Sequence, residues 1–310
     1  MTGTPLFSWM AEVDRPLVAA LEQRGATVHA PLWHEPAVDW EAFDVAVVRT
    51  AWDYPDRRAE FVDWAVRAGA STRLWNPPDV LRWNTHKSYL LELEDRGAPV
   101  VPSAWLGQGD RIDLGELLRA RGWTEAVIKP TVASGSSGLL RVTAAGSTAV
   151  VGAGRDDLAV GTTAAGTAGA GRVDLATGQR HLDGLLQTGD AVVQPYLSAI
   201  ATRGELSVVV LDGMVSHAVR KHPVEGDFRV QEDFGGSCVP EQVDAEVAAL
   251  ARWVVDAVGT ELLLARVDLV EDDDGTLQLL ELEATEPDLY LTVVPDAAGR
   301  IADAILRRAS

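Results

Sequence analysis

The sequence predicts an α/β protein in which an N-terminal, doubly wound parallel-sheet domain precedes two α+β subdomains. A chain of 310 residues is too long for one ordinary core. The chain opens with a short apolar run at 5–9, a predicted helix over 15–24 that Gly25 ends, and apolar runs that end at Val28 and span 44–48. This alternation of strand, helix and strand is typical of a parallel sheet. Farther on, apolar runs flank Asp-Gly turns, as in antiparallel hairpins. We expect domains at 1–103, 104–192 and 193–310.

Composition excludes several classes of partner. A net charge of −19 argues against nucleic-acid binding and against attraction to anionic membranes. Cys238 is the only cysteine, so no intramolecular disulfide can form. The N-terminus has no pattern of a secretory signal, and no apolar run reaches membrane-spanning length. We expect a cytoplasmic protein that acts on a small molecule, and the sequence leaves a homodimer open.

The strand at 44–48 ends in a polar and aromatic stretch. In open α/β sheets, ligands bind beyond the carboxyl ends of the strands, and Arg49, Trp52 and Tyr54 lie at such an end. Arg49 could hold a substrate carboxylate, and the two aromatic rings could line a pocket. The alternative, that Arg49 fixes a loop and the aromatic rings are core, is equally compatible with the sequence.

Lysine is rare enough to indicate function. Of 27 basic residues, only Lys87, Lys129 and Lys221 are lysines. A compact ammonium group suits phosphate where a planar guanidinium would not fit. The spacing of apolar residues predicts a helix over 85–96, which places Lys87 in its first turn, where a positive charge is unfavourable unless an anion lies nearby. Chance survival in an arginine-rich composition is the alternative for any one of them.

A strand ending in Lys129 leads into a loop of small residues. Such a loop lets backbone N–H groups approach phosphate oxygens closely. The stretch 152–178, rich in Gly, Ala and Thr, is expected to be mostly mobile loop without chemistry of its own. We expect both segments to be poorly ordered without ligand and to move over the site. The small-residue loop comprises Ser134, Gly135, Ser136, Ser137 and Gly138.

The second half continues with a helix near 182–186 and a strand from Ala191. Because Pro195 interrupts strand pairing, 194–197 is expected to connect two subdomains. A hairpin over 205–211 and 214–220 delivers His217 and Lys221. His217 could accept a proton from a nucleophile, although a structural role is the more common one. Arg229 follows, and helices are predicted over 241–258 and 296–308.

The hairpin at 262–287 carries three carboxylates on one face. If Asp274 and Gly275 form its tip, antiparallel counting places Asp268 opposite Glu281 and Arg266 opposite Glu283. Like charges crowded on one face repel unless a cation binds, and oxygen ligands suit Mg²⁺. The alternative is a solvated strand face with Arg266 as counter-ion.

The ordered motifs HKSYL, VIKP, a Gly/Ser loop, VVQPYL, GELSVVVLDG, DFR, RVDLV and LELEATEP resemble the ATP-grasp superfamily over residues 82–287. Within it, the chain is similar to the glutathione synthetase and ribosomal-protein glutamate ligase branch. RWxxxKxYL, QPY and the LELE run are most similar to the O-ureido-D-serine cyclo-ligases, which close the cycloserine ring in secondary metabolism. Two features differ: glutathione synthetases usually have Asn at the position of Glu283, and DFRVQEDFGG is more similar to the glutamate ligases.

The resemblance implies ATP-driven formation of an acyl phosphate, followed by attack of a nitrogen nucleophile, with the N-terminal domain on the substrate side. ATP and two Mg²⁺ are the implied cofactors, with Mn²⁺ as an alternative ion. It also assigns roles: ATP phosphates to Lys87, Lys129 and the 134–138 loop; adenine to Gln194, Tyr196 and Leu197; ribose to Glu205; the transferring phosphoryl group to Lys221 and Arg229; metal to Asp268, Glu281 and Glu283. Arg266 is expected to act as a catalytic cation together with Lys221 and Arg229. The residues expected to contact the substrate are Arg49, Trp52, Tyr54 and His217.

Three functions follow as hypotheses. The first is a carbon–nitrogen ligase acting on a small amino-acid-like carboxylate, either by intramolecular cyclisation or by intermolecular amide formation. The second is a small-molecule kinase, which would release ADP without phosphate. The third is a nucleotide-binding protein without turnover, which the full set of lysines and carboxylates disfavours.

Overall fold

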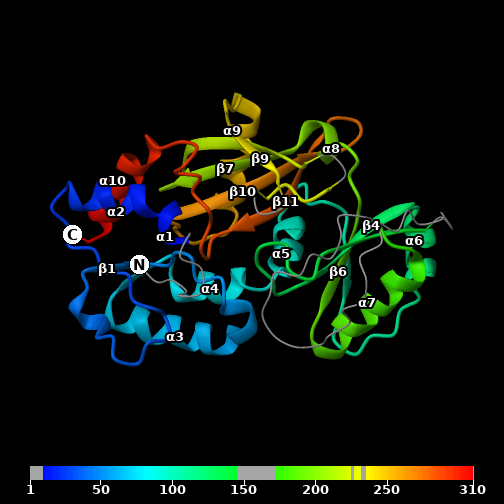
Figure 1. Cartoon of the computed structure of the whole chain (residues 1–310), viewed down its shortest axis with the longest axis horizontal. Coiled ribbons are helices and arrows are strands. Elements are labelled where there is room, and N and C mark those ends of the chain that lie inside the picture. The colour runs from blue at the N-terminus through cyan, green and yellow to red at the C-terminus, as the bar shows by residue number, and fades with distance from the viewer. Residues whose placement is uncertain (1–9, 145–171, 225–226, 232–234, 310) are drawn as a thin grey trace.

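The computed structural model describes residues 10–144, 172–224, 227–231 and 235–309. These residues contain three sheets, which lie in three regions of the chain (Figure 1). None of the described helices is both long enough and apolar enough to span a bilayer. The strand predicted at 5–9 and most of the Gly/Ala-rich stretch fall outside the described residues.

The N-terminal region contains a parallel strand pair, as predicted. β1 and β2 pair in parallel, with Ala46 opposite Leu74. The strand expected to end at Val28 does not form; that segment is irregular and leads into Pro31, which cannot donate to a strand ladder. The elements are α1 (Met10–Val13), α2 (Arg15–Glu22), the 3₁₀ turn η1 (Trp40–Ala42), β1 (Val45–Val47), η2 (Tyr54–Arg57), α3 (Arg58–Ser71), β2 (Arg73–Trp75), α4 (Pro78–Asn84) and α5 (Tyr89–Asp95).

Aromatic side chains form the core of this region. Trp33 meets Phe61 edge to face with ring centroids 5.4 Å apart, and Trp40 meets Trp64 in the same way at 5.3 Å. Phe61 and Trp64 are almost fully buried. The many tryptophans of the N-terminal part therefore include a packed cluster.

The central region is a four-stranded antiparallel sheet in the order β3-β6-β4-β5. Gln194 and Pro195 belong to this sheet, opposite Val127 and Ala126, so the predicted connection at 194–197 begins later than expected. The helix predicted near 182–186 extends back into the predicted mobile loop. The elements are β3 (Ala104–Leu106), α6 (Leu114–Arg121), β4 (Glu125–Pro130), β5 (Leu140–Thr143), α7 (Leu175–Thr188) and β6 (Ala191–Pro195).

The C-terminal region is a five-stranded antiparallel sheet in the order β11-β10-β7-β8-β9. One face of this sheet packs against α5 and α9. Part of the opposite face packs against α2 and α10. The helix predicted from 241 begins only at Ala245, because Glu241 ends β9 and the Asp244 side chain caps Val247 N–H. The elements are α8 (Ile200–Arg203), β7 (Glu205–Leu211), β8 (Met214–His222), β9 (Ser237–Glu241), α9 (Ala245–Asp256), β10 (Leu264–Glu271), β11 (Leu277–Glu283) and α10 (Ala297–Ala309).

The register of the carboxylate hairpin is as predicted, although its tip is not. Asp268 lies opposite Glu281, and Arg266 opposite Glu283. At the tip, however, Asp272 N–H donates to Thr276 across an intervening loop of three residues, rather than the predicted Asp274-Gly275 turn of two. An irregularity between Asp268 and Leu269 compensates for the extra residue.

Candidate active site

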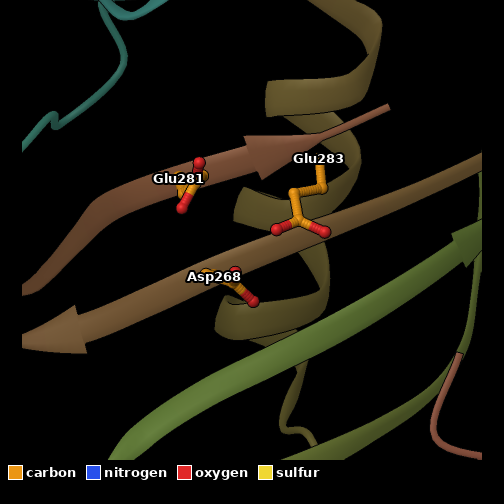
Figure 2. Close-up of side chains that lie close together, drawn as sticks. All are labelled: Asp268, Glu281 and Glu283. Atoms are coloured by element: carbon orange, nitrogen blue, oxygen red, sulfur yellow. The ribbon is translucent and has the colours of Figure 1, made fainter. Parts of the chain in front are cut away.

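Three carboxylates converge on one face of the C-terminal sheet. Asp268 extends from β10, and Glu281 and Glu283 extend from β11 (Figure 2). One carboxylate oxygen of each residue lies within 4.8 Å of a carboxylate oxygen of each of the other two. We call these three residues the carboxylate cluster. An all-oxygen donor set of this kind fits a hard divalent cation such as Mg²⁺.

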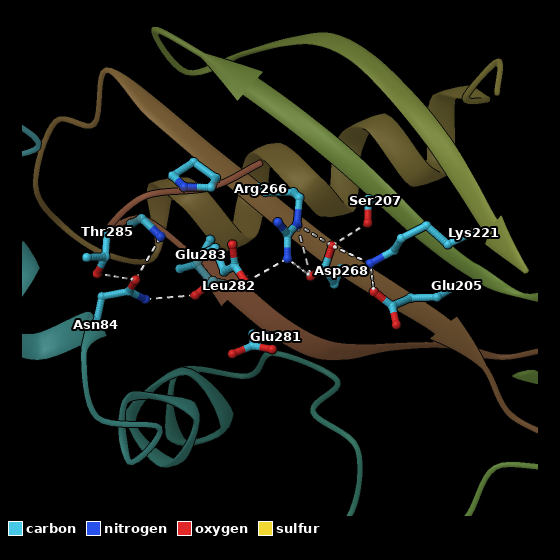
Figure 3. A network of polar contacts seen from close by, with 12 residues as sticks. Asn84, Glu205, Ser207, Lys221, Arg266, Asp268, Glu281, Leu282, Glu283 and Thr285 are labelled. Atoms are coloured by element: carbon cyan, nitrogen blue, oxygen red, sulfur yellow. Dashed lines mark hydrogen bonds and ion pairs between the residues drawn. The ribbon is translucent and has the colours of Figure 1, made fainter. Parts of the chain in front are cut away.

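Protein cations neutralise the carboxylate cluster (Figure 3). Arg266 bridges two of its members, 2.7 Å from an oxygen of Asp268 and 2.7 Å from one of Glu283. Lys87 forms a close ion pair with Glu281. Lys87 precedes α5 rather than lying in its first turn, so the predicted conflict with the helix dipole does not arise. Its anionic neighbour is instead this carboxylate.

The three carboxyl groups differ in acidity. Burial alone would raise the pKa of each, but Arg266, Lys221 and the Ser207 hydroxyl outweigh it at Asp268 and lower its pKa to about 2. Lys87 likewise lowers the pKa of Glu281. At Glu283, burial together with Glu281 and Asp268 prevails over Arg266 and raises the pKa to about 7. Glu283 is therefore the member whose ionisation depends most on an added cation.

A second ion pair continues the same sheet face. In the sheet, Ser207 of β7 lies opposite Asp268 of β10. On the other side of β7, Glu205 lies opposite Lys221 of β8. Lys221 pairs closely with Glu205 and lies 3.9 Å from Asp268. Burial would lower the pKa of Lys221, but the two carboxylates prevail and raise it. The lysine is thus held as a cation between the predicted ribose residue and the carboxylate cluster.

Lys129 stands at the end of β4 without such a partner. Among the described residues it forms no ion pair, and burial, opposed mainly by Glu281, lowers its pKa to about 8. The small-residue loop follows it: Gly135, Ser136 and Gly138 all have positive φ angles. Ser134 Oγ donates to the Trp52 carbonyl across 3.2 Å, which links this loop to the N-terminal domain.

A pocket joins these parts. The small-residue loop, the turn before α5 and the C-terminal end of β11 form its walls, and Tyr54 closes it from the N-terminal domain. Tyr54, one of the residues predicted to contact a substrate, lines this pocket and is itself buried. The lining includes Tyr54, Asn84, Thr85, Lys87, Thr131, Ala133, Ser134, Glu281, Leu282, Glu283, Thr285 and Glu286.

The predicted adenine residues lie at the end of β6. Gln194 is buried and donates to Ser103 Oγ over 2.9 Å. The guanidinium carbon of Arg141 lies 3.4 Å from the centroid of the Tyr196 ring. Leu197 follows, partly exposed. One face of the Tyr196 ring is therefore covered by a protein cation.

Arg229 and His217 do not belong to the lining of this pocket, and each contacts other protein groups. Arg229 forms a bidentate pair with Asp227: Nε donates to Oδ1 over 3.1 Å, and Nη2 donates to Oδ2 over 2.8 Å. His217 Nε2 lies 2.8 Å from the Leu289 carbonyl, and its Nδ1 lies 3.0 Å from Ser216 Oγ. Burial lowers the pKa of His217. These contacts fit a structural role for His217 better than proton transfer.

The structure contradicts the expectation that Arg49 is available to a substrate carboxylate. Its side chain is 2% exposed, and Nη2 and Nε lie 2.8 and 3.0 Å from Asp14 Oδ1. Nη1 donates to the carbonyl of Pro287. Arg49 therefore ties the N-terminal domain to the segment after β11. Sequence could not reveal this, because Asp14 and Pro287 are far from it in the chain.

Arg49→Ala should consequently destabilise the fold. Removing one partner leaves the buried Asp14 carboxylate uncompensated, which costs about 3–5 kcal/mol. Denaturant unfolding of Arg49→Ala, Asp14→Ala and the double variant measures the coupling between them. Additive losses would contradict the ion-pair role, and an unchanged unfolding free energy with a raised substrate KM would restore the original expectation.

Sequence reasoning missed the residues that fix the end of β11. Asn84 Nδ2 donates to the Leu282 carbonyl, and Asn84 Oδ1 accepts from Ala284 N–H, both at 2.7 Å. Glu286, in the same LELEATEP motif as Glu281 and Glu283, lines the pocket. A third glutamate in a predicted metal motif was the available signal. No local pattern marks Asn84, since its partners lie about 200 residues away.

The sequence matches two family models and a curated relative. Residues 4–76 match the model of the N-terminal domain of D-cycloserine synthetase DcsG, and residues 161–305 match that of the RimK-like ATP-grasp domain. The chain is 31% identical over 308 residues to the cycloserine biosynthesis protein DcsG of Streptomyces lavendulae, covering 94% of this chain and 92% of that protein.

Solved structures show the same fold. A crystal structure of D-cycloserine synthetase DcsG is 28% identical, with a TM-score of 0.82, and the match covers 100% of this chain and 98% of the other. A D-alanine–D-alanine ligase from Bacillus anthracis matches with a TM-score of 0.65 at 14% identity, over 100% and 95% of the two chains. The ATP-grasp ligase PsnB, in complex with a precursor, Mg and ADP, matches with a TM-score of 0.63 at 17% identity, over 100% and 97%.

Proposed function

The chain belongs to the ATP-grasp ligases, in the family of D-cycloserine synthetase DcsG, and from this premise we propose that it joins a carboxylate to a nitrogen nucleophile and releases ADP and phosphate. The observation that carries the proposal is the convergence of Lys87, Glu281 and Glu283 on one pocket, with Asp268 close to the two glutamates. Lys129, which forms no ion pair among the described residues, lies near Glu281 and Lys87. Cation-binding and phosphate-binding groups thereby meet where a carboxylate can enter.

The proposed reaction requires both a cation-binding group and phosphate-binding groups. A carboxylate is a poor electrophile because hydroxide would have to leave. When one of its oxygens attacks the γ-phosphorus of ATP, ADP leaves and an acyl phosphate forms. Nitrogen then attacks the acyl carbon, the C–O bond to phosphate breaks, and the proton that the nitrogen loses passes to the departing phosphate or to solvent. Positioning and charge neutralisation dominate phosphoryl transfer of this kind.

We assign Lys87, Lys129 and the small-residue loop to the phosphates of ATP. The loop offers backbone N–H groups, and the two lysines offer point charges. Gln194, Tyr196 and Leu197 are assigned to the adenine, and Lys221 and Arg229 to the phosphoryl group in transfer. For the ribose we retain Glu205, which would exchange part of its ion pair with Lys221 for ribose hydroxyls.

Asp268, Glu281 and Glu283 would hold Mg²⁺, two ions being the number we propose. Bound there, Mg²⁺ would draw negative charge from the phosphates. Arg266, which now bridges Asp268 and Glu283, would remain as a fixed cation behind the cluster. The raised pKa of Glu283 fits this assignment, because a bound cation would favour its ionised form.

The proposed substrate is a small amino-acid-like carboxylate, and ring closure is the proposed reaction. The family match to D-cycloserine synthetase DcsG over nearly the whole chain supports cyclisation. Amide formation between two molecules would use the same activated carboxylate. The two reactions differ in whether a separate amine is needed.

A coupled assay tests the proposal. With Mg²⁺ and ATP, we expect a matching amino acid to stimulate release of ADP and phosphate in equal amounts, with loss of the substrate carboxylate. O-Ureido-D-serine is the first compound to test, followed by D- and L-amino acids with and without added amines. ADP release without phosphate would indicate a kinase instead. No stimulation by any carboxylate would reject the proposed function.

A further inference from the structure

Glu286 is a buried acid that the proposed roles leave unused. It is 9% exposed and lines the pocket beside Glu283 and Tyr54. Its Oε2 is buried and, among the described residues, has no hydrogen-bond partner. A carboxylate in such a place is costly unless a donor or a cation meets it. The side chain therefore lacks a partner that a ligand in the pocket could supply.

The neighbouring cations are committed elsewhere. Arg49 and Arg266 are close enough to lower the pKa of Glu286, but burial and Glu283 prevail. Arg49 is paired with Asp14, and Arg266 with the carboxylate cluster. Neither forms an ion pair with Glu286. No described protein group therefore supplies the partner that Glu286 Oε2 lacks.

Glu286 is also held in place from both sides. The hydroxyl of Thr285 donates to Asn84 Oδ1 over 3.0 Å, and the carbonyl of Pro287 accepts from the buried Arg49. These contacts restrain the chain on both sides of Glu286, so the backbone that carries its side chain need not be ordered when a ligand binds.

We propose that Glu286 binds the α-ammonium group of an amino-acid substrate whose carboxylate is activated at the carboxylate cluster. This inference rests on the proposed ligase function. An α-amino acid carries its ammonium and carboxylate groups on the same carbon, and Glu286 lines the same pocket as Glu281 and Glu283, so one molecule can present a group to each. The proposed metal site contains Asp268, Glu281 and Glu283, each of which brings an oxygen within 4.8 Å of the other two. Glu286 is not part of this group, so the ammonium group that it binds lies apart from the proposed metal site.

The chemistry discriminates between substrates. A charge-assisted hydrogen bond to the ammonium group favours an α-amino acid over the same acid with hydrogen at that position. The Tyr54 ring, which lines the same pocket, would border the ammonium group. The enzyme should thus reject carboxylates that lack the amino group, whatever the rest of the side chain is.

The test compares paired substrates with paired enzymes. Wild type and Glu286→Gln are assayed for ADP release with each activating α-amino acid and with its deamino counterpart. Wild type should prefer the amino acid by about 10- to 100-fold in kcat/KM, the range of one charge-assisted hydrogen bond. Glu286→Gln should lose most of that preference through a higher substrate KM, with the KM for ATP and the Mg²⁺ dependence unchanged.

Controls separate the possible failures. Glu246→Gln, at an exposed position of α9, should keep the wild-type preference. Thermal unfolding verifies that Glu286→Gln is folded; if it is not, equal use of amino and deamino acids by wild type alone overturns the inference. The inference is also overturned if folded Glu286→Gln keeps the wild-type preference for the amino acid, or if its defect lies in the Mg²⁺ dependence. If no carboxylate stimulates ADP release in wild type, the ligase proposal fails and this inference with it.

Discussion

Glu281→Gln is expected to lower kcat at least about a hundredfold while the protein stays folded. Mutating groups that merely support metal ligands commonly costs 10- to 100-fold, and Glu281 is proposed as a ligand itself. Its carboxylate also pairs with Lys87, so the substitution disturbs both the cation and the phosphate side of the pocket. Steady-state ADP release at saturating and limiting Mg²⁺ measures the effect.

The same hairpin provides a matched control. Glu271 lies toward the tip of β10, where it pairs with Arg203 at 2.7 Å, outside the pocket lining. Glu271→Gln removes the same chemical group from the same pair of strands and should leave kcat within about twofold, since exposed ion pairs contribute little. Full activity of Glu281→Gln at limiting Mg²⁺ would refute the metal assignment.

Lys129→Ala should weaken ATP binding by about 1.5–3 kcal/mol, the value of a hydrogen bond to a charged group. Lys129→Arg should restore little of this, because a planar guanidinium does not fit a site shaped for an ammonium group. Calorimetric titration with a non-hydrolysable ATP analogue measures both. Arg119→Ala, which removes an exposed charge from the same subdomain, is the control. Unchanged affinity in Lys129→Ala would disprove the phosphate role.

The acidity of Lys129 adds a pH dependence to that prediction. Its pKa of about 8 is lower than the ordinary 10.5, so the free protein loses this proton as pH rises through 8. Phosphate binding favours the protonated form, which means that binding takes up protons near pH 8 and that affinity falls above it. Titrations in buffers of different ionisation enthalpy should show this uptake in wild type and not in Lys129→Ala.

Local sequence patterns predicted the pairing of the hairpin that carries the carboxylate cluster. Alternation along β10 and β11 was enough to place Asp268, Glu281 and Glu283 on one face. The pairing was correct even though the turn was not, because an irregularity beside Asp268 offset the longer tip. The hairpin from Glu205 to His222 was equally readable, since Asp212 and Gly213 both adopt positive φ, as its Asp-Gly turn requires.

Long-range partners could not be predicted in this way. The sequence marks Arg49 as a cation at a strand end, and only the fold reveals Asp14 beside it. Lys87 was identified through its rarity, but its pairing with Glu281 spans 194 positions. The strand expected at Val28 failed because short apolar runs are ambiguous without a pairing partner. Predictions were therefore strongest where neighbouring residues determine the geometry.

Transfer of oxygen tests the acyl phosphate most directly. The substrate carboxylate is labelled with ¹⁸O, and the released phosphate is analysed by mass spectrometry after a turnover with Mg²⁺ and ATP. Because the carboxylate oxygen that attacks the γ-phosphorus leaves with phosphate, we predict one ¹⁸O atom in each phosphate formed. Phosphate that carries no label, released together with ADP during product formation, would contradict activation of the carboxylate by phosphorylation.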